Sequence, residues 1–144
     1  MNNSIVIFKK IVDSNNRKYN IKKYSIKILY APHEPNKKPK NKFAIYAFVH
    51  NGKFLKIGKC GPKSYARFNY QHYNPKSTNS NLAKSILLDK NNYSKYKINK
   101  TNIAKWIKNN CTRIEVIFDD RVKDNYITYL ESLLILELEP KYEK

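Results

Sequence analysis

The sequence predicts an α+β domain, in which a β-hairpin is followed by helices, one more strand and a long last helix, with two additional strands in front. Two strand-like runs, 43–50 and 53–60, flank an Asn-Gly pair and predict the hairpin. Helical patterns follow the hairpin, and an alternating run at 112–120 predicts a later strand. With 144 residues, one domain with its own core is expected.

The N-terminal part is expected to extend the sheet. Residues 4–12 (SIVIFKKIV) and 19–30 (YNIKKYSIKILY) are rich in β-branched and aromatic residues with partial alternation, which predicts two strands. Residues 31–42 (APHEPNKKPKNK) hold three of the six prolines and a run of lysines, which indicates a loop. Its lysines either lie on phosphates or form a solvated surface. The chain therefore divides into 1–42, the strands with the basic Pro-rich loop, and a main domain, 43–144.

The register of the hairpin depends on its turn. A two-residue turn at Asn51 and Gly52 would place Lys56 on the apolar face, whereas a three-residue loop beginning at His50 keeps it on the other face. Because a buried lysine costs several kcal/mol, we expect the three-residue loop. Tyr46 and Lys56 are then directly opposed, with Cβ atoms about 5 Å apart. The expected apolar face consists of Ile45, Ala47, Val49, Leu55 and Ile57.

The three glycines of the chain all lie between positions 52 and 61. Glycine permits positive φ and the close approach of a ligand or another backbone, so this grouping indicates a special use. In the expected register, Gly58 and Ala44 leave a shallow patch beside Tyr46 and Lys56. The Tyr-Lys pair is either part of a site or an ordinary exposed cross-strand pair.

The second half of the main domain alternates helices with a strand. A helix is expected from Pro62 to about Tyr73, with proline at a favourable first-turn position. A second helix, about 81–89, is capped by Asn79 or Ser80, and a third is capped by Thr101. The last helix begins at Asp124 and is stopped by Pro140.

The charge indicates a polyanionic partner. Lys and Arg number 29 against 11 Asp and Glu, which gives a net charge of +18. An A/T-rich genome also favours lysine, but it does not deplete Asp and Glu to the same degree. Nucleic acid is the leading partner, since phosphates release counterions to a dense positive surface. A membrane surface is the weaker alternative, because no basic amphipathic helix and no apolar run of roughly 20 residues is present.

The two cysteines, Cys60 and Cys111, are far apart and lack a Cys-x-x-Cys spacing. This usage indicates a reducing interior and predicts a cytoplasmic location, with Cys111 in the core and Cys60 at a strand end. The apolar run in the N-terminal segment is too short for a signal-peptide core.

Three further residues are candidates for chemistry. Arg67 stands out in a lysine-rich chain, since a guanidinium suits bidentate phosphate contact, although it could equally stack on a surface aromatic ring. His72 is either an acid–base or phosphate-binding group or a structural histidine. Glu131 shares a helix side with apolar residues, so it is paired with a lysine, protonated or bound to a cation such as Mg²⁺. Those apolar residues are Ile127, Leu134, Ile135 and Leu138.

The motifs resemble the GIY-YIG nuclease superfamily, in particular its restriction-endonuclease branch. "AIY" at 44–46, nine intervening residues and "KIG" at 56–58 resemble the signature of the family. A helix with Arg67 and a later one with Glu131 in "YLESLLILELEPKY" resemble its other two motifs. The match covers roughly 43–142. Ala44 replaces the first glycine and Lys56 the second tyrosine, a lysine that some restriction enzymes of the superfamily also carry. Either Gln71 or His72 stands at the family's position after the arginine, and Glu143 replaces its terminal asparagine.

The resemblance implies a small three-stranded antiparallel sheet flanked by helices, and phosphodiester hydrolysis that depends on Mg²⁺ or Mn²⁺. Tyr46 would be the general base, with Lys56 favouring its phenolate. Arg67 would stabilise charge on the scissile phosphate, and Glu131 would hold the metal ion.

Three functional readings follow. The leading one is a DNA endonuclease, in the form of a small type II restriction enzyme, for which cleavage of both strands favours a homodimer. The second is a structure-specific or mobile-element nuclease. The third is a basic nucleic-acid-binding module without activity. No RNA-stacking motif is evident, so DNA is the expected substrate.

Overall fold

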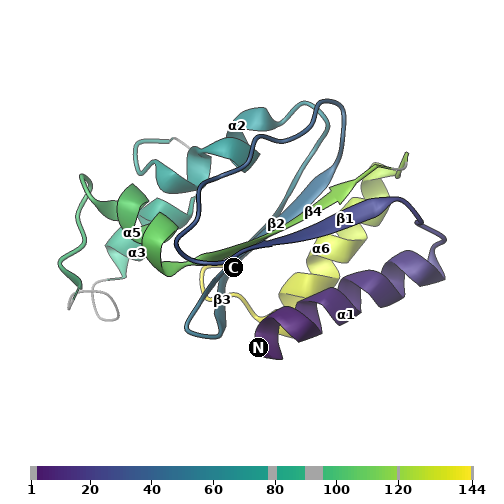
Figure 1. Ribbon diagram of the computed structural model, residues 1–144, viewed down its shortest axis with the longest axis horizontal. Helices are drawn as coiled ribbons and strands as arrows, with labels where there is room; N and C mark the ends of the chain where they lie inside the picture. The colour runs from purple at the N-terminus through teal and green to yellow at the C-terminus, as the bar shows by residue number, and fades with distance from the viewer. Residues whose placement is uncertain (1–2, 78–80, 90–95, 120, 144) are drawn as a thin grey trace.

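The structure is a computed structural model that describes residues 3–77, 81–89, 96–119 and 121–143. A four-stranded antiparallel sheet with the strand order β1-β4-β2-β3 forms its centre, and helices cover both faces (Figure 1). The prediction of an α+β domain with a small antiparallel sheet flanked by helices is confirmed. The strands are β1 (Tyr24–Leu29), β2 (Ala44–His50), β3 (Lys53–Cys60) and β4 (Thr112–Phe118).

The alternation of side chains along β2 divides the core into two layers. Odd-numbered apolar residues such as Ile45 and Ala47 pack toward α1 (Asn3–Lys18) and α6 (Asp124–Leu138). Even-numbered residues such as Tyr46 and Phe48 pack toward the opposite side. That side is covered by α2 (Tyr65–Asn69), the 3-10 turn η1 (Gln71–Tyr73), α3 (Leu82–Leu88) and α5 (Ile103–Asn110).

The prediction of a strand at 4–12 is wrong, because this segment lies within α1. Ile5, Phe8 and Val12 are buried at helical spacing and pack on the same core as α6. Tertiary burial of this stripe outweighs the β-propensity of its branched residues. Within the second predicted strand, residues 24–29 do form β1, which pairs with β4 and so adds a fourth strand at the edge of the sheet.

The hairpin turn also differs from the prediction. Asn51 and Gly52 form a two-residue turn with φ angles of 50° and 76°, and His50 pairs with Lys53. A register shift next to Phe48 then leaves Leu55 as an extra residue, so that Phe48 pairs with Lys56.

The bulge changes which residues share a face. Tyr46 pairs with Gly58 and not with Lys56, so the predicted Tyr-Lys opposition is wrong. Leu55 packs in the layer of Tyr46, and Phe54 takes the place expected for it in the other layer. The remaining apolar face, Ile45, Ala47, Val49 and Ile57, is confirmed.

The helices after the hairpin are shorter than predicted. The expected helix to Tyr73 breaks at Tyr70 into α2 and η1. Asn81 caps α3, where its side chain accepts a hydrogen bond from the backbone N–H of Lys84 at 2.9 Å; the predicted caps at 79 and 80 lie outside the described residues.

The other predicted elements compare as follows. Asn102 precedes α5 in place of Thr101, whereas β4 and α6 lie where expected. Cys111 lies in the core and Cys60 at the end of β3, both as predicted, and Cys60 is buried as well.

The loop at 31–42 is neither purely solvated nor simply a row of free lysines. Lys38 is 4% exposed, and its ammonium donates hydrogen bonds to the carbonyl oxygens of Pro39, Lys42 and Pro62 at 2.6–3.1 Å. Its backbone N–H donates to the Asn69 side chain, so the loop is fastened to α2.

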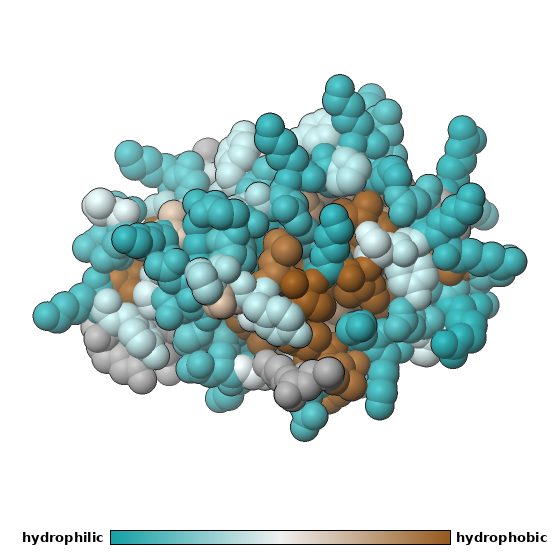
Figure 2. All heavy atoms as spheres, in the orientation of Figure 1, coloured by the Kyte–Doolittle hydropathy of each residue, from teal (hydrophilic) through white to brown (hydrophobic). Residues whose placement is uncertain are grey.

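Figure 2 shows that hydrophilic side chains cover most of one face and surround an apolar patch over β1 and α1. Ile26 and Ile28 of β1 are partly buried, and Ile7 of α1 is exposed. Among the described residues, each helix is too short or too polar to cross a membrane.

Candidate active site

The ring of Tyr46 lies across the backbone of Gly58, its partner on β3. A β-carbon at position 58 would stand 2.3 Å from the phenolic oxygen and 2.5 Å from the ring carbon that bears it. Only glycine leaves room for this ring. The clearance lets a side chain of the inner strand β2 reach over β3, which is an edge strand of the sheet.

His72 holds the hydroxyl of Tyr46. The Nδ1 atom of His72 accepts a hydrogen bond from the backbone N–H of Leu82 at 3.2 Å, so its Nε2 carries the proton of the neutral ring. Nε2–H therefore donates to the phenolic oxygen of Tyr46, at a distance of 2.5 Å. The break between α2 and η1 brings His72 to this place, and of the two predicted alternatives it is His72 rather than Gln71 that contacts Tyr46.

Burial sets the protonation of both groups. Tyr46 has no exposed surface, and burial is the main cause that raises its pKa above that of a free tyrosine. Burial, followed by the charge of Lys56, lowers the pKa of His72 to about 2. At neutral pH the pair is therefore a neutral phenol that accepts a hydrogen bond from a neutral imidazole.

The charges of Arg67 and Glu131, which lie in helices on opposite faces of the sheet, both affect the pKa of the Tyr46 phenol. After burial and Cys60, the guanidinium of Arg67 lowers the pKa of Tyr46, and the carboxylate of Glu131 raises it. Arg67 lies in α2 and is exposed, whereas Glu131 is half-buried in α6 on the other face of the sheet. The structure thus places His72 against Tyr46, and the charges of Arg67 and Glu131 both affect the pKa of the Tyr46 phenol.

Glu131 lies where its helical spacing predicts, next to the buried Ile127 and Leu134. Burial raises its pKa, and the nearby Glu143 adds to this effect. The ammonium of Lys59, the charge of Arg67 and a hydrogen bond from the backbone N–H of Lys59 act in the opposite direction. This carboxylate is thus half-buried beside a second carboxylate.

Lys56 is not the cross-strand partner of Tyr46, so the strand pairing does not supply the ammonium that was expected to favour the Tyr46 phenolate. It is 6% exposed, and its ammonium pairs with Glu143 at 3.2 Å. The guanidinium groups that lower the pKa of Tyr46 are Arg67 and Arg113. Lys56 lines a pocket of about 720 Å³ together with Arg67, Lys84, Ser85, Leu88, Lys141, Tyr142 and Glu143.

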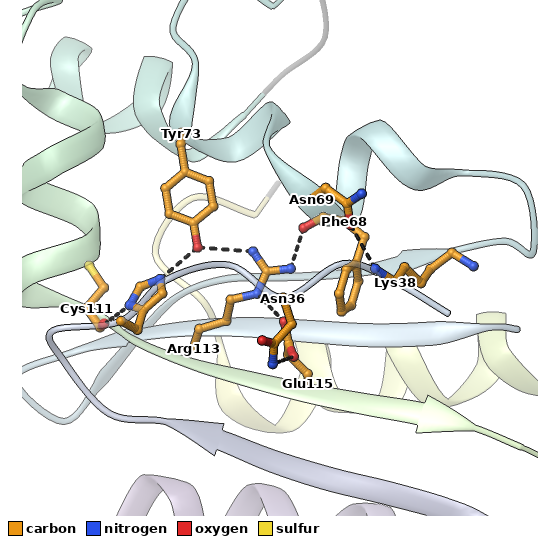
Figure 3. A network of polar contacts seen from close by, with 9 residues as sticks. Asn36, Lys38, Phe68, Asn69, Tyr73, Cys111, Arg113 and Glu115 are labelled. Atoms are coloured by element: carbon orange, nitrogen blue, oxygen red, sulfur yellow. Dashed lines mark hydrogen bonds and ion pairs between the residues drawn. The ribbon is translucent and has the colours of Figure 1, made fainter. Parts of the chain in front are cut away.

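A buried polar network centred on Arg113 lies in the same layer as Tyr46 (Figure 3). Arg113 is fully buried, and its Nε donates to the carboxylate of Glu115 at 2.8 Å. Its other nitrogens donate to the hydroxyl of Tyr73 and to the carbonyl oxygen of Phe68. The guanidinium lies 4.6 Å from the ring centre of Phe68 and 5.9 Å from that of Tyr46.

The network continues to the Pro-rich loop. Nδ1–H of His33 donates to the carbonyl oxygen of Cys111, so its Nε2 accepts from the hydroxyl of Tyr73, both at 2.7 Å. Asn36 donates to the carboxylate of Glu115 at 3.1 Å. The loop thereby holds the layer that carries Tyr46.

Sequence reasoning missed Arg113 and Glu115 as members of the site. The available signal was their spacing, since residues i and i+2 of a strand share a face and β4 is otherwise apolar at its centre. The pairing of Tyr46 with Glu115 across β2 and β4 depends on strand order, which the sequence pattern does not reveal.

The residues present can hold one hydrated divalent cation. Mg²⁺ keeps several waters and needs few protein oxygens, and Glu131 with Glu143 nearby offers such a set. A cation there would offset the unfavourable closeness of two carboxylates. Within the described ranges, no cluster of three or more His, Cys, Asp or Glu side chains forms a larger metal cage.

The chain matches no protein-family model, and comparison with curated proteins and with solved structures gives no match either.

Proposed function

We propose that this protein is a metal-dependent endonuclease that hydrolyses phosphodiester bonds of DNA. The observation that carries the proposal is the clearance at Gly58, which lets Tyr46 reach the β3 edge where Arg67 and Glu131 both act on it. A residue with a β-carbon at position 58 would collide with the ring in this position. The net charge of +18 supports a nucleic-acid substrate.

In the proposed reaction, Tyr46 first loses its phenolic proton to solvent as the substrate and metal bind, and the phenolate oxygen then takes a proton from the attacking water. His72 donates its Nε2–H to the phenolic oxygen, and this hydrogen bond stabilises the negative charge that develops there. Arg113 and Arg67 also favour the phenolate. Arg67 is exposed and so is placed to contact the phosphate as well.

Glu131, with Glu143 beside it, would hold Mg²⁺ or Mn²⁺, which would supply charge stabilisation to the phosphate and the leaving oxygen. Neutralisation of the Glu131 charge removes one cause that raises the pKa of Tyr46. Because Tyr46 is fully buried, hydrolysis through its hydroxyl requires the side chains around the phenol to open a path for water while the hydrogen bond from His72 is kept.

The burial of Tyr46 favours a second candidate, a basic DNA-binding module without activity. In that reading the Tyr46–His72 hydrogen bond is only a structural contact of the core, and the phenol never meets water. The basic surface would then account for the whole function. The two candidates differ in whether bound DNA is cut.

Among nucleases, a small restriction enzyme remains the leading form, and a structure-specific or mobile-element nuclease is the alternative. With one site per chain, cleavage of both strands favours a homodimer.

Incubation with supercoiled plasmid and Mg²⁺ separates these possibilities. Discrete fragments support a restriction enzyme, nicks or structure-dependent cuts support the alternative nuclease, and retarded but intact plasmid supports the binding module. Glu131→Ala should abolish cleavage while DNA binding persists. Glu137→Ala, an exposed carboxylate of the same helix, is the matched control and should cut normally. Cleavage by the Glu131→Ala protein at the rate of the unaltered protein would contradict the assignment of Glu131 as the metal-binding residue.

A further inference from the structure

The pocket beside the candidate active site gathers positive charge from four segments of the chain. Lys56 of β3, Arg67 of α2, Lys84 of α3 and Lys141 near the C-terminal end line it, and Glu143 is the one carboxylate among its described lining residues. The pocket has a volume of about 720 Å³ and is open to solvent. Such a concentration of cations around one hollow is typical of a site for an anion.

Two of these cations are held in place by carboxylates. Lys56 pairs with Glu143, and Lys141 pairs with Asp89 at 2.8 Å. Asp89 also accepts a hydrogen bond from the hydroxyl of Tyr142 at 2.8 Å, which fixes the C-terminal segment against the end of α3. Lys141 is therefore oriented before any ligand arrives.

The C-terminal segment forms the outer wall of the pocket. The backbone N–H groups of Lys141 and Tyr142 donate to the carbonyl oxygens of Phe54 and Leu55, both at 3.0 Å. The segment thus runs along the free edge of β3, and it brings Lys141 and Glu143 into the lining of the pocket.

Lys84 of α3 completes the set of cations that line the pocket. It lies in the first turn of α3, next to Ser85, which also lines the pocket and whose hydroxyl donates to the carbonyl oxygen of Asn81 at 3.1 Å. Among the described residues, Lys84 and Arg67 form no ion pair within 4 Å. An incoming phosphate can therefore neutralise these two cations without displacing an internal partner. The Lys141 side chain is 35% exposed and its ammonium has three donors, so it can contact a phosphate while it keeps its pair with Asp89.

We propose that this pocket binds a backbone phosphate of the substrate DNA next to the scissile one, with Lys84 and Lys141 as its contacts. The inference rests on the proposed function, because Arg67 belongs both to the pocket and to the candidate active site. Phosphate contacts of this kind position the duplex and do not read its sequence. They would hold the strand in register over the β3 edge.

The test is the salt dependence of DNA binding, measured in EDTA so that no cleavage takes part. The affinity for a short DNA duplex is followed by fluorescence anisotropy between low and moderate salt. Each lost phosphate contact lowers the slope of log K against log salt by about 1. Lys84→Gln and Lys141→Gln should each lower the slope by about this amount, whereas Lys84→Arg should keep it.

Lys105→Gln and Lys9→Gln are the controls, because both lysines are exposed and lie outside the pocket on different faces of the sheet. Their slopes should equal that of the unaltered protein. An unchanged slope for Lys84→Gln and Lys141→Gln, or equal losses in the controls, would overturn the proposal. So would a protein that does not bind the duplex.

The outcome is independent of the nuclease assignment. If the two pocket variants lose slope but plasmid is never cut, the phosphate site stands and the nuclease falls. If plasmid is cut in a Glu131-dependent way and the slopes do not change, the nuclease stands and the phosphate site falls.

Discussion

The phenolic oxygen of Tyr46 lies 2.3 Å from the point where a β-carbon of residue 58 would be, so Tyr46 and Gly58 occupy one shared space. Gly58→Ala must therefore displace the ring, with an expected loss of about 1–3 kcal/mol in the free energy of unfolding. The loss is measured by urea denaturation.

A double-mutant cycle isolates this relationship. In a Tyr46→Ala background the ring is absent, so Gly58→Ala should cost much less than in the unaltered protein. Gly61→Ala is the control, since a β-carbon there would meet only the Ser64 hydroxyl, at 3.8 Å. Equal costs of Gly58→Ala in both backgrounds would show that the ring does not depend on the glycine.

His72 makes stability depend on pH. Its pKa in the folded protein is about 2, below the ordinary value of 6.5, so the unfolded chain binds one more proton between these pH values. The contribution of His72 to the free energy of unfolding is therefore complete above about pH 6.5. It is lost as the pH falls toward the folded-state pKa, by about 1.4 kcal/mol per pH unit at most. The comparison is between the unaltered protein and His72→Gln, each unfolded by urea at pH 7 and at pH 5. Parallel losses in the two proteins would contradict the burial of a neutral imidazole.

The buried pair of Arg113 and Glu115 should be costly to break. Glu115→Gln leaves the guanidinium without its counter-charge, and one-sided removal from a buried pair costs about 3–5 kcal/mol. Replacement of both residues by Met and Leu should recover most of this loss. Glu34→Gln is the matched control, because Glu34 pairs with Lys108 at the surface and should contribute less than about 1 kcal/mol. Urea unfolding that ranks Glu115→Gln with Glu34→Gln would refute the role given to the network.

The order of the later elements followed directly from local patterns. The alternation of β4, the stop at Pro140 and the apolar spacing around Glu131 are each set within one segment, and each lies where it was expected. The segment 4–12 is a helix and not the predicted strand. Its β-branched residues favour a strand, but Ile5, Phe8 and Val12 also have the spacing of one helix face, and that spacing decides the structure.

The site itself depends on relations between segments. Because of the bulge at Leu55, Tyr46 pairs with Gly58 and not with Lys56 as predicted. The local sequence pattern does not indicate a bulge. Likewise, His72 reaches Tyr46 because the helix breaks at Tyr70, and Arg113 reaches it through the pairing of β2 with β4. The residue types were therefore predictable, whereas their partners were not.

The most direct test of the central claim is the single-turnover rate of plasmid cleavage with Mg²⁺ for Tyr46→Phe against Tyr129→Phe. Both changes remove one hydroxyl and keep the ring, but Tyr129 lies on α6 in a separate pocket with Tyr19 and Tyr126. The account predicts a rate about 10²–10⁴-fold lower for Tyr46→Phe and an unchanged rate for Tyr129→Phe. Equal rates for Tyr46→Phe and the unaltered protein would contradict it.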